Sequence, residues 1–356
     1  MNRNNNPFIT RFFSEYAELK CTLMEVCGTH TNVIRKAGIH RLLPPGIRLL
    51  SGPGCPVCVT GSGYIEQAIS LSRRPEVIIS SFGDLLKVPG NTGTLSEARA
   101  KGGQIRVVYS PLDAVVLARS NPAKEVVFLG VGFETTAPII ALAVQEARES
   151  GLKNFSVLPA LKILNPALRA LLSDASFKLH GLIAPGHLSV IVGADSLAFL
   201  PEEFKLPTVI TGFQTPELWL GLEALARQIK EGSARLENKY SQVVTPAGNP
   251  AAQKLIRELF SPEFTEWRGL GGIEASGFGF QEAFQDFDAR RRFAISPIPS
   301  EEPGGCLCGQ ILLGKAEPED CPHFDAACNP EHPVGPCMVS TEGACAAHYY
   351  YRDIKS

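Results

Sequence analysis

The sequence has no long apolar run, and none approaches the roughly 20 residues that a membrane-spanning helix needs. Residues 1–7 also lack the apolar core of a signal peptide. We therefore expect a cytoplasmic protein that contacts no membrane. Positive charge is not in excess either, because 34 Lys and Arg stand against 36 Asp and Glu, a net charge of −2. A chain with this charge balance has no overall positive electrostatic field to attract a nucleic-acid backbone, so we expect no nucleic-acid partner.

Cysteine is absent from the middle of the chain. None of the ten cysteines lies between residues 59 and 305, whereas four lie at positions 21, 27, 55 and 58 and six lie between 306 and 345. In a reducing compartment, clustered cysteines serve metal or redox chemistry more often than they form structural disulfides. The distribution therefore points to such chemistry near both ends of the chain.

The composition, with 44% apolar and 20% charged residues over 356 positions, is that of a globular chain of two or three domains. Between residues 75 and 220, short β-branched runs alternate with helical patterns, which is typical of an α/β fold with buried parallel strands. The expected strands are 77–82, 105–109, 126–130, 181–184 and 208–211, and the expected helices are 62–74, 95–101, 138–150 and 217–231.

Changes in the alternation of strand and helix patterns along the chain suggest the domain organisation. The pattern changes near residue 151, the strand signal fades after about residue 236, and the chain becomes loop-like beyond residue 297. We expect two parallel-sheet α/β domains plus a small, loop-rich, metal-organised module. The predicted parts are an amino-terminal segment (1–19), a first α/β domain (20–150), a second α/β domain (151–295) and a cysteine-rich module (296–356).

The carboxy-terminal cysteines are embedded in Gly, Pro and Asn residues that bend the chain. Four of them form a C-x12-C-x6-C-x16-C pattern: Cys308, Cys321, Cys328 and Cys345. Four thiolates suit either a [4Fe–4S] cluster or a structural zinc ion. Structural zinc sites usually have cysteines in closely spaced pairs, whereas these four cysteines are spread singly along the chain. Their spacing therefore favours the cluster.

Two further cysteine motifs lie nearer the amino terminus. In GPGCPVC, Cys55 and Cys58 precede a helix that begins near Ser62, and the positive end of a helix dipole acidifies a thiol so that it can form and open a disulfide. Half of a zinc site is the alternative. In MEVCGTHT, Cys27 and His30 have the chemistry to bind one metal ion, with Gly28 permitting the turn between them.

Two loops follow expected strands, which is where open α/β sheets bind ligands. The first, GFETTAP, contains Glu134 and Thr135, and the second, APGHLS, contains His187. Helix capping explains the hydroxyl groups in these loops equally well, but it does not explain Glu134 and His187. Neither loop has a G-x-G-x-x-G or Walker A pattern.

Taken together, MEVCGTHT, GPGCPVCVT, GFETTAP, APGHLS and the tail CGQ…CPHF…C…MVSTEGACAA resemble the HypD family of hydrogenase maturation factors. The match runs in order from about residue 20 to the end. The resemblance implies a scaffold that builds the Fe(CN)2CO unit of [NiFe]-hydrogenase with a HypC-type chaperone and a HypE-type cyanide donor. The hydrogenase large subunit is then an indirect partner. It also implies two α/β domains and a module with a [4Fe–4S] cluster.

The resemblance also implies roles for the motif residues. Cys27 corresponds to the iron-binding thiol with His30 beside it, and Cys55 and Cys58 to a redox-active dithiol. The cluster ligands correspond to Cys308, Cys321, Cys328 and Cys345, with Cys306 and Cys337 as extra thiols. The loops that contain Glu134, Thr135 and His187 correspond to the lining of a cleft between the α/β domains.

The expected mechanism follows from these roles. Iron binds Cys27 together with a thiol of the chaperone, the dithiol supplies or accepts electrons, and the cluster exchanges electrons with the dithiol. This is an assembly scaffold with redox activity rather than a conventional turnover enzyme. Two alternatives remain: a zinc-stabilised binding protein whose thiols are structural, and a nucleotide-hydrolysing enzyme that uses the GFETT loop.

Overall fold

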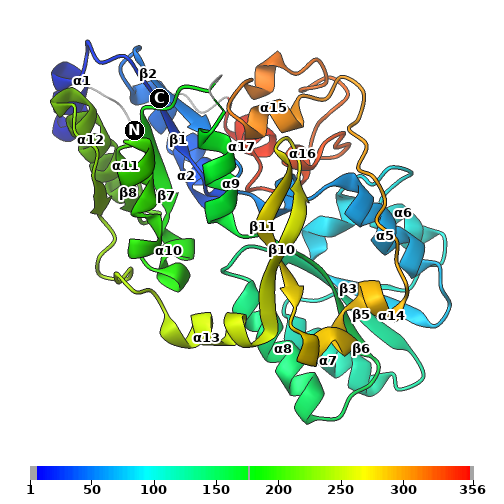
Figure 1. Cartoon of the computed structure of the whole chain (residues 1–356). Helices are drawn as coiled ribbons and strands as arrows, with labels where there is room; N and C mark the ends of the chain where they lie inside the picture. Colours follow the sequence, from blue (N-terminus) through cyan, green and yellow to red (C-terminus); the bar gives the residue numbers. More distant parts are fainter. Residues whose placement is uncertain (1–5, 175–176, 353–356) are drawn as a thin grey trace.

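A computed structural model describes residues 6–174 and 177–352 and contains two parallel β-sheets (Figure 1). Residues 1–5 of the expected amino-terminal segment, residues 175–176 of the second expected domain and residues 353–356 of the cysteine-rich module lie outside this description. Among the described helices, none has both the length and the apolar character to cross a membrane.

Sheet A has the strand order β2-β1-β7-β8-β9, and sheet B has the order β4-β3-β5-β6, with every neighbouring pair parallel. Four strands, β3, β6, β7 and β8, are buried at every residue, because helices cover the sheets. The strand bounds are β1 (Cys21–Glu25), β2 (Ile47–Ser51), β3 (Val77–Ser81), β4 (Ile105–Val107), β5 (Glu125–Gly132), β6 (Phe155–Leu161), β7 (Gly181–Pro185), β8 (Thr208–Thr211) and β9 (Leu236–Asn238). The predicted α/β class with two parallel sheets is confirmed.

Local sequence signals set many helix ends. Helix α7 begins with a capping box between Ser110 and Asp113, and α12 ends at Gly232, whose φ of 63° suits glycine. The first twelve helices are α1 (Pro7–Glu15), α2 (Gly28–Lys36), α3 (Ile39–Leu42), α4 (Pro56–Val59), α5 (Ser62–Ser72), α6 (Leu95–Ala100), α7 (Pro111–Ser120), α8 (Ala137–Glu149), α9 (Leu164–Leu172), α10 (Gly186–Val192), α11 (Phe199–Phe204) and α12 (Thr215–Glu231). The others are α13 (Pro250–Leu259), α14 (Ala289–Arg292), α15 (Cys308–Leu312), α16 (Pro336–Val339) and α17 (Ala344–Tyr351), with 3-10 turns η2 (Gly83–Lys87), η3 (Asp195–Leu197), η4 (Glu282–Phe287) and η5 (Pro318–Asp320).

The two sheets do not divide the chain at residue 151, where the sequence predicts a boundary. Strand β6, which follows that residue, pairs with β5 in sheet B, and β1 pairs with β7 in sheet A. The chain therefore starts in sheet A, builds all of sheet B, and then returns to complete sheet A. The change of sequence pattern near Gly151 marks the end of helix α8, where Gly151 adopts a φ of 65°.

A long antiparallel hairpin occupies the region where the strand signal fades. Its strands, β10 (Phe260–Trp267) and β11 (Gly271–Phe280), contradict the expectation that strands end near residue 236. Residues of β10 alternate between partly buried and exposed positions, and β11 contains several glycines. Neither strand contains a β-branched run, so the strand signal in the sequence is weak. In Figure 1 the hairpin runs from the region of β6 toward α15 and α16.

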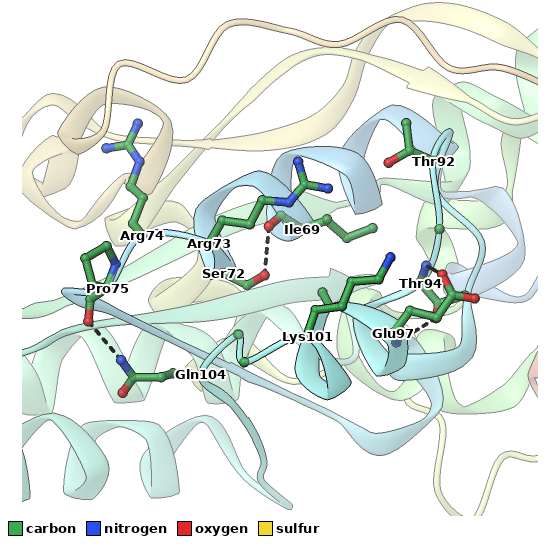
Figure 2. Close-up of a pocket in the computed structure, with 14 residues that line it drawn as sticks. Ile69, Ser72, Arg73, Arg74, Pro75, Thr92, Thr94, Glu97, Lys101 and Gln104 are labelled. Carbon is green, nitrogen blue, oxygen red and sulfur yellow. Dashed lines mark hydrogen bonds between the residues drawn. The ribbon is translucent and has the colours of Figure 1, made fainter.

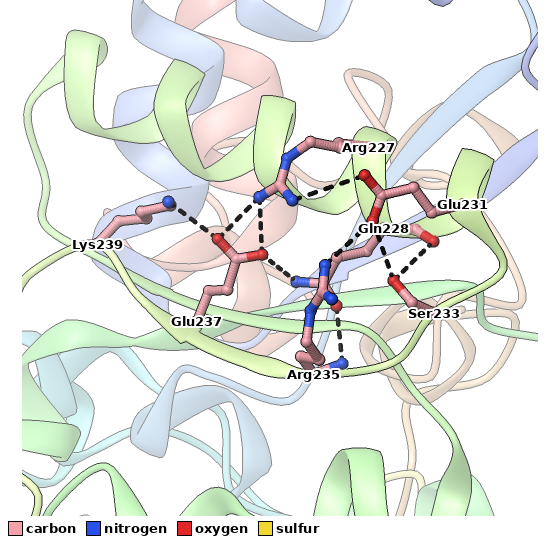
Figure 3. A network of polar contacts seen from close by, with 7 residues as sticks. All are labelled: Arg227, Gln228, Glu231, Ser233, Arg235, Glu237 and Lys239. Atoms are coloured by element: carbon pink, nitrogen blue, oxygen red, sulfur yellow. Dashed lines mark hydrogen bonds and ion pairs between the residues drawn. The ribbon is translucent and has the colours of Figure 1, made fainter.

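A polar network adds to the backbone pairing and the packing of Leu236 that hold the last strand of sheet A (Figure 3). Glu237 of β9 accepts hydrogen bonds from Arg227 (2.8 Å) and Gln228 (2.9 Å), both of α12. Arg235 donates to Glu231 at 3.0 Å on the same helix. A strand of three partly exposed residues buries little apolar surface, so these charged contacts supplement its pairing with β8.

The cysteine-rich module consists of short helices and loops that pack on sheet A and on the hairpin. Asn32 of α2 donates to the carbonyl of Thr341 (3.0 Å), and Tyr351 of α17 lies against the same asparagine (3.4 Å). This module therefore lies beside the loop that contains Cys27.

Candidate functional site

A cavity of about 160 Å³ lies at the carboxyl ends of strands from both sheets. Cys27 follows β1 and His187 follows β7, its parallel neighbour in sheet A. Thr135 follows β5 of sheet B, and Pro56 follows β2. The lining residues are Val26, Cys27, Thr29, Gly54, Pro56, Phe133, Thr135, Thr136, Leu164, Pro185, His187, Leu188 and Glu342. Parallel strands present their carboxyl ends at one edge of a sheet, and this is how four distant motifs meet.

Cys27 is half-buried in this cavity, at the amino terminus of α2. Its backbone N–H donates to Glu25 Oε2 at 2.9 Å, and Thr31 donates to the other oxygen of the same carboxylate. Burial raises the pKa of Cys27 to about 12, and the charges of Glu25 and Glu342 add to that effect. The thiol is therefore protonated at neutral pH, and a metal ion that binds it must displace the proton.

Gly28 has a different purpose from the one predicted. Its φ is not positive, so it is not needed for a turn. A Cβ atom at this position would lie 2.3 Å from Glu342 Cβ and 2.8 Å from the Glu342 carbonyl oxygen. The glycine therefore lets the cysteine-rich module approach the Cys27 loop, where Thr29 Oγ1 donates to Glu342 Oε1 at 2.8 Å.

His30 does not line the cavity with Cys27. Its side chain is fully buried against sheet A, with Nε2 3.0 Å from the Gly212 carbonyl and 3.2 Å from Thr211 Oγ1, and its ring stacks on Phe213 (4.7 Å between centroids). Burial lowers its pKa to about 4, so the ring is neutral. His187 stacks on the same Phe213 (3.8 Å) and does line the cavity. The imidazole that lines the cavity together with Cys27 is therefore that of His187.

Glu134 and Thr135 have different positions. Thr135 lines the cavity, whereas Glu134 is buried behind the wall, where Oε1 accepts the N–H of Leu164 (3.0 Å) at the start of α9. Its other oxygen, Oε2, has no hydrogen-bond partner among the described residues. Burial raises the pKa of Glu134 to about 7. The carboxyl group thus supports the cavity wall rather than facing its contents.

Cys55 and Cys58 form a disulfide in this structure. Cys55 caps the short helix α4, and its Sγ accepts the N–H of Cys58 at 3.2 Å. The pair therefore belongs to a helix of its own, and the helix predicted near Ser62 begins three residues later as α5. The disulfide lies behind the cavity wall formed by Gly54 and Pro56. The Gly54 carbonyl accepts the Gly28 N–H at 3.2 Å, and a Cβ at Gly54 would lie 2.2 Å from Cys27 N. The flanking glycine therefore allows the two cysteine loops to pack backbone against backbone.

The six carboxy-terminal cysteines all line one small apolar pocket, which we call the thiol pocket: Cys306, Cys308, Cys321, Cys328, Cys337 and Cys345. Cys308 Sγ and Cys337 Sγ are 2.6 Å apart, and Cys345 also interacts with Cys337. The hydrogen bond from Cys337 lowers the pKa of Cys308, burial opposes this effect, and the charge of Arg268 adds to the lowering. Cys337, predicted to be an extra thiol, is fully buried at the centre of the group.

The thiol pocket fits the chemistry of an iron–sulfur cluster. Its polar lining atoms are soft sulfurs, with no carboxylate or imidazole among the lining residues. Within residues 6–174 and 177–352, no three His, Cys, Asp or Glu side chains converge on the position of a single metal ion. Four of the six thiols are enough for a [4Fe–4S] cluster, and the backbone N–H of Val334 already donates to Cys328 Sγ at 3.3 Å.

The disulfide lies next to the thiol pocket. Cys58 Sγ is 4.0 Å from the carbonyl oxygen of Pro336, the residue before Cys337. The structure therefore arranges three groups of cysteines one after another in space. Cys27 lies in the cavity, the disulfide lies behind the cavity wall, and the thiol pocket lies beyond α4. Sequence reasoning missed Glu25 and Glu342, although both lie inside motifs that it singled out. The available signal was a carboxylate within two or three residues of a reactive cysteine.

A larger hollow lies elsewhere, between α5 and α6 (Figure 2). It has a volume of about 340 Å³, and Arg73 and Lys101 extend along its rim. It contains no cysteine, histidine or motif residue. The candidate site is therefore the smaller cavity at the strand ends.

These features define an α/β protein with a cysteine, a histidine and a disulfide grouped at the carboxyl ends of its strands. The HypD family model, described as "Hydrogenase formation hypA family", matches residues 8–352. The chain is 43% identical to the hydrogenase maturation factor HypD of Rhodobacter capsulatus over 341 residues, which cover 94% of this chain and 90% of that protein. It is 42% identical to HypD of Escherichia coli K12 (96% and 91%) and 45% identical to the hydrogenase expression/formation protein HupD of Azotobacter chroococcum mcd 1 (92% and 89%). The chain belongs to the HypD family of hydrogenase maturation factors.

Proposed function

We propose that this protein is the scaffold on which the Fe(CN)2CO unit of [NiFe]-hydrogenase is assembled. The observation that carries the proposal is the cavity at the strand ends, because it exposes one cysteine, Cys27, to an incoming metal ion. The lining of the same cavity adds one imidazole, one carboxylate and three hydroxyl groups: His187, Glu342, Thr29, Thr135 and Thr136. An iron carrier needs such a partial ligand set, since other positions must stay open for a partner's sulfur and for diatomic ligands.

The iron ion is cargo in this proposal, and Cys27 is its protein ligand. A HypC-type chaperone supplies a second thiol, a HypE-type protein supplies cyanide, and the hydrogenase large subunit receives the product indirectly. Cys27 gives up its proton when iron binds, and Glu342 and His187 are the side chains of the cavity lining that can accept it. Glu25 holds the backbone of the Cys27 loop in place during exchange.

The Cys55–Cys58 pair stores two electrons when it is reduced. Two electrons and two protons convert the disulfide to two thiols, and the reverse reaction returns them. Low-spin ferrous iron is the form that binds cyanide and CO, so a two-electron store behind the cavity wall has a chemical purpose. Four cysteines among Cys308, Cys321, Cys328, Cys345 and their neighbours would hold a [4Fe–4S] cluster, which supplies one-electron redox chemistry when bound.

The test is infrared spectroscopy of the complex with the small chaperone, purified without oxygen. The parent complex should show CN and CO stretching bands, and Cys27→Ser should lose them while keeping the brown colour and the iron of the thiol pocket. Cys21→Ser is the matched control, because it changes a buried thiol of β1 that lies outside the cavity. Bands of parental intensity in Cys27→Ser would show that iron is held elsewhere.

Metal analysis of the same preparations separates the alternatives. Iron and sulfide without zinc support the cluster, whereas zinc in the thiol pocket favours a binding protein with structural thiols. Nucleotide turnover by the isolated protein would instead favour a hydrolase that uses the GFETT loop.

A further inference from the structure

The tip of the β10–β11 hairpin touches all three thiol regions. Trp267, the last residue of β10, packs against Phe133 of the cavity wall, with ring centroids 5.7 Å apart. Arg268 contacts the residues that end helix α4, directly after the disulfide. Gly269 lies against Gly309, the residue after Cys308. Three consecutive residues therefore connect the Cys27 cavity, the disulfide and the thiol pocket.

Arg268 is an unusual residue at this position because its side chain is only 1% exposed. A buried guanidinium is rare unless it is paired and fully hydrogen-bonded. Its backbone N–H donates to the Val59 carbonyl (2.9 Å), and its Nη2 and Nε donate to the Thr60 carbonyl (3.2 and 3.4 Å). Two carbonyls at the carboxyl end of α4 thus accept hydrogen bonds from one residue of the hairpin.

The ionic partner of Arg268 does not share its burial. Nη1 is 2.5 Å from Glu302 Oε2, and the Glu302 side chain is 46% exposed. Water screens an exposed carboxylate more strongly than it screens a buried cation, so part of the positive charge remains effective inside the protein. Gly269, the residue after Arg268, lies against Gly309, so the hairpin tip is held at the start of α15, where Cys308 is the first residue.

Close packing keeps the hairpin tip next to Cys308. Gly269 has a φ of 83°, and a Cβ atom there would lie 2.6 Å from the Gly309 carbonyl oxygen. The tip cannot carry a larger residue without moving away from the start of α15. The strand that leads into the tip is fixed as well, since the buried Lys162, directly after β6, donates to Thr265 (2.8 Å) and to the Glu266 carbonyl (2.7 Å).

We propose that Arg268 is a positioning residue that holds the disulfide helix α4 against the thiol pocket and places a buried positive charge beside Cys308. The inference deepens the proposed function and rests on it. Thiolate ligands and a cluster carry net negative charge, which a nearby cation stabilises most in the more reduced state. Arg268 therefore makes the occupied thiol pocket easier to reduce.

The experiment compares four variants of the full chain, purified without oxygen: Arg268→Gln, Arg268→Lys, Glu302→Gln and Arg73→Gln. The first readout is the midpoint potential of the cluster. Arg268→Gln should lower the equilibrium constant for one-electron reduction at least tenfold, which corresponds to 59 mV. Glu302→Gln should shift the midpoint in the opposite direction. Arg73→Gln, the same change at the exposed end of α5, should leave it unchanged.

A second readout separates position from charge. The rate at which a small phosphine reduces the Cys55–Cys58 disulfide should rise several-fold in Arg268→Lys, because a lysine keeps the charge but cannot make the forked contact with Thr60. The cluster midpoint of this variant should stay close to that of the parent.

Equal midpoints in Arg268→Gln, Arg73→Gln and the parent would overturn the proposal, as would a Glu302→Gln midpoint that does not rise. If Arg268→Gln does not fold, Glu302→Gln and Arg268→Lys still decide between the outcomes. A parent protein without an iron–sulfur cluster would overturn the proposed function together with this inference, whereas a loaded parent with no shift in any variant would overturn this inference alone.

Discussion

In the parent protein, the free energy of unfolding should fall as the pH rises, because of Glu134. Replacing Glu134 by glutamine should remove this loss. Glu134 is fully buried, its Oε2 has no partner in the described chain, and burial raises its pKa from the ordinary 4.5 to about 7. Between these two pH values the folded protein keeps a proton that the unfolded chain releases. The free energy of unfolding therefore falls as pH rises through this window.

The magnitude follows from the two pKa values. A difference of about 2.5 units at 1.36 kcal/mol per unit gives about 3 kcal/mol. Glutamine carries no charge at any pH, so the variant lacks this term. The free energy of unfolding of Glu134→Gln, minus that of the parent, should increase by about 3 kcal/mol from pH 4 to pH 8. At pH 4 the difference reflects only the change of a carboxyl to an amide beside Leu164, on the order of 1 kcal/mol.

Denaturant unfolding of both proteins at five pH values measures this difference. Other buried groups, such as His30, titrate in both proteins and cancel in the subtraction. Glu146→Gln is the control, since hydrogen bonds from Arg119 and Ser150 lower the pKa of this exposed carboxylate, and its difference should change with the opposite sign. A Glu134→Gln difference that is constant across pH would refute the reasoning, because the carboxyl would then have the same proton affinity in both states.

Three more predictions concern the thiols. Cys345→Ser should lose most of the cluster absorption and iron, because an alkoxide is a poorer soft ligand, and full iron and sulfide content would contradict this. Thiol trapping across a redox titration should show Cys55 and Cys58 passing between dithiol and disulfide, whereas reduced thiols at every potential would favour a structural role. Gly28→Ala should separate the cysteine-rich module from the Cys27 loop, since the added Cβ would lie 2.3 Å from Glu342 Cβ. Limited proteolysis should then cut near residue 342 faster than in the parent, and an unchanged rate would mean that the module accommodates the methyl group.

Strands and helices with strong local patterns could be predicted from the sequence. The five β-branched runs became β3, β4, β5, β7 and β8, and the four helical patterns became α5, α6, α8 and α12. Strand β6 was missed because it contains Pro159, which an edge strand of sheet B tolerates. The hairpin was missed because its glycines serve close packing against Phe264 and Thr265 rather than a strand pattern.

The site could be predicted as a set of motifs but not as an arrangement. Sequence order places Cys27, Thr135 and His187 more than 50 residues from one another, and only the pairing of β1 with β7 and the docking of sheet B bring them together. The orientation of the His30 side chain was not predictable either, because it depends on a contact with Gly212, which follows β8 and lies 182 residues away in the sequence. Spacing between cysteines gives ligand chemistry, whereas burial and backbone contacts decide which thiol faces a cavity.

The raised pKa of Cys27 fits a carrier better than a permanent metal site. An ordinary thiol has a pKa of 9.0, and that of Cys27 is about 12, so displacing its proton costs about 4 kcal/mol more. In the proposed function, a proton therefore competes with iron for this sulfur at neutral pH, and it returns to the sulfur when the iron leaves. The same burial keeps the thiol unreactive between cycles, because the thiolate is the form that oxidants attack. A site that must release its cargo to another protein gains from both effects, whereas a structural metal site would be weakened by the first.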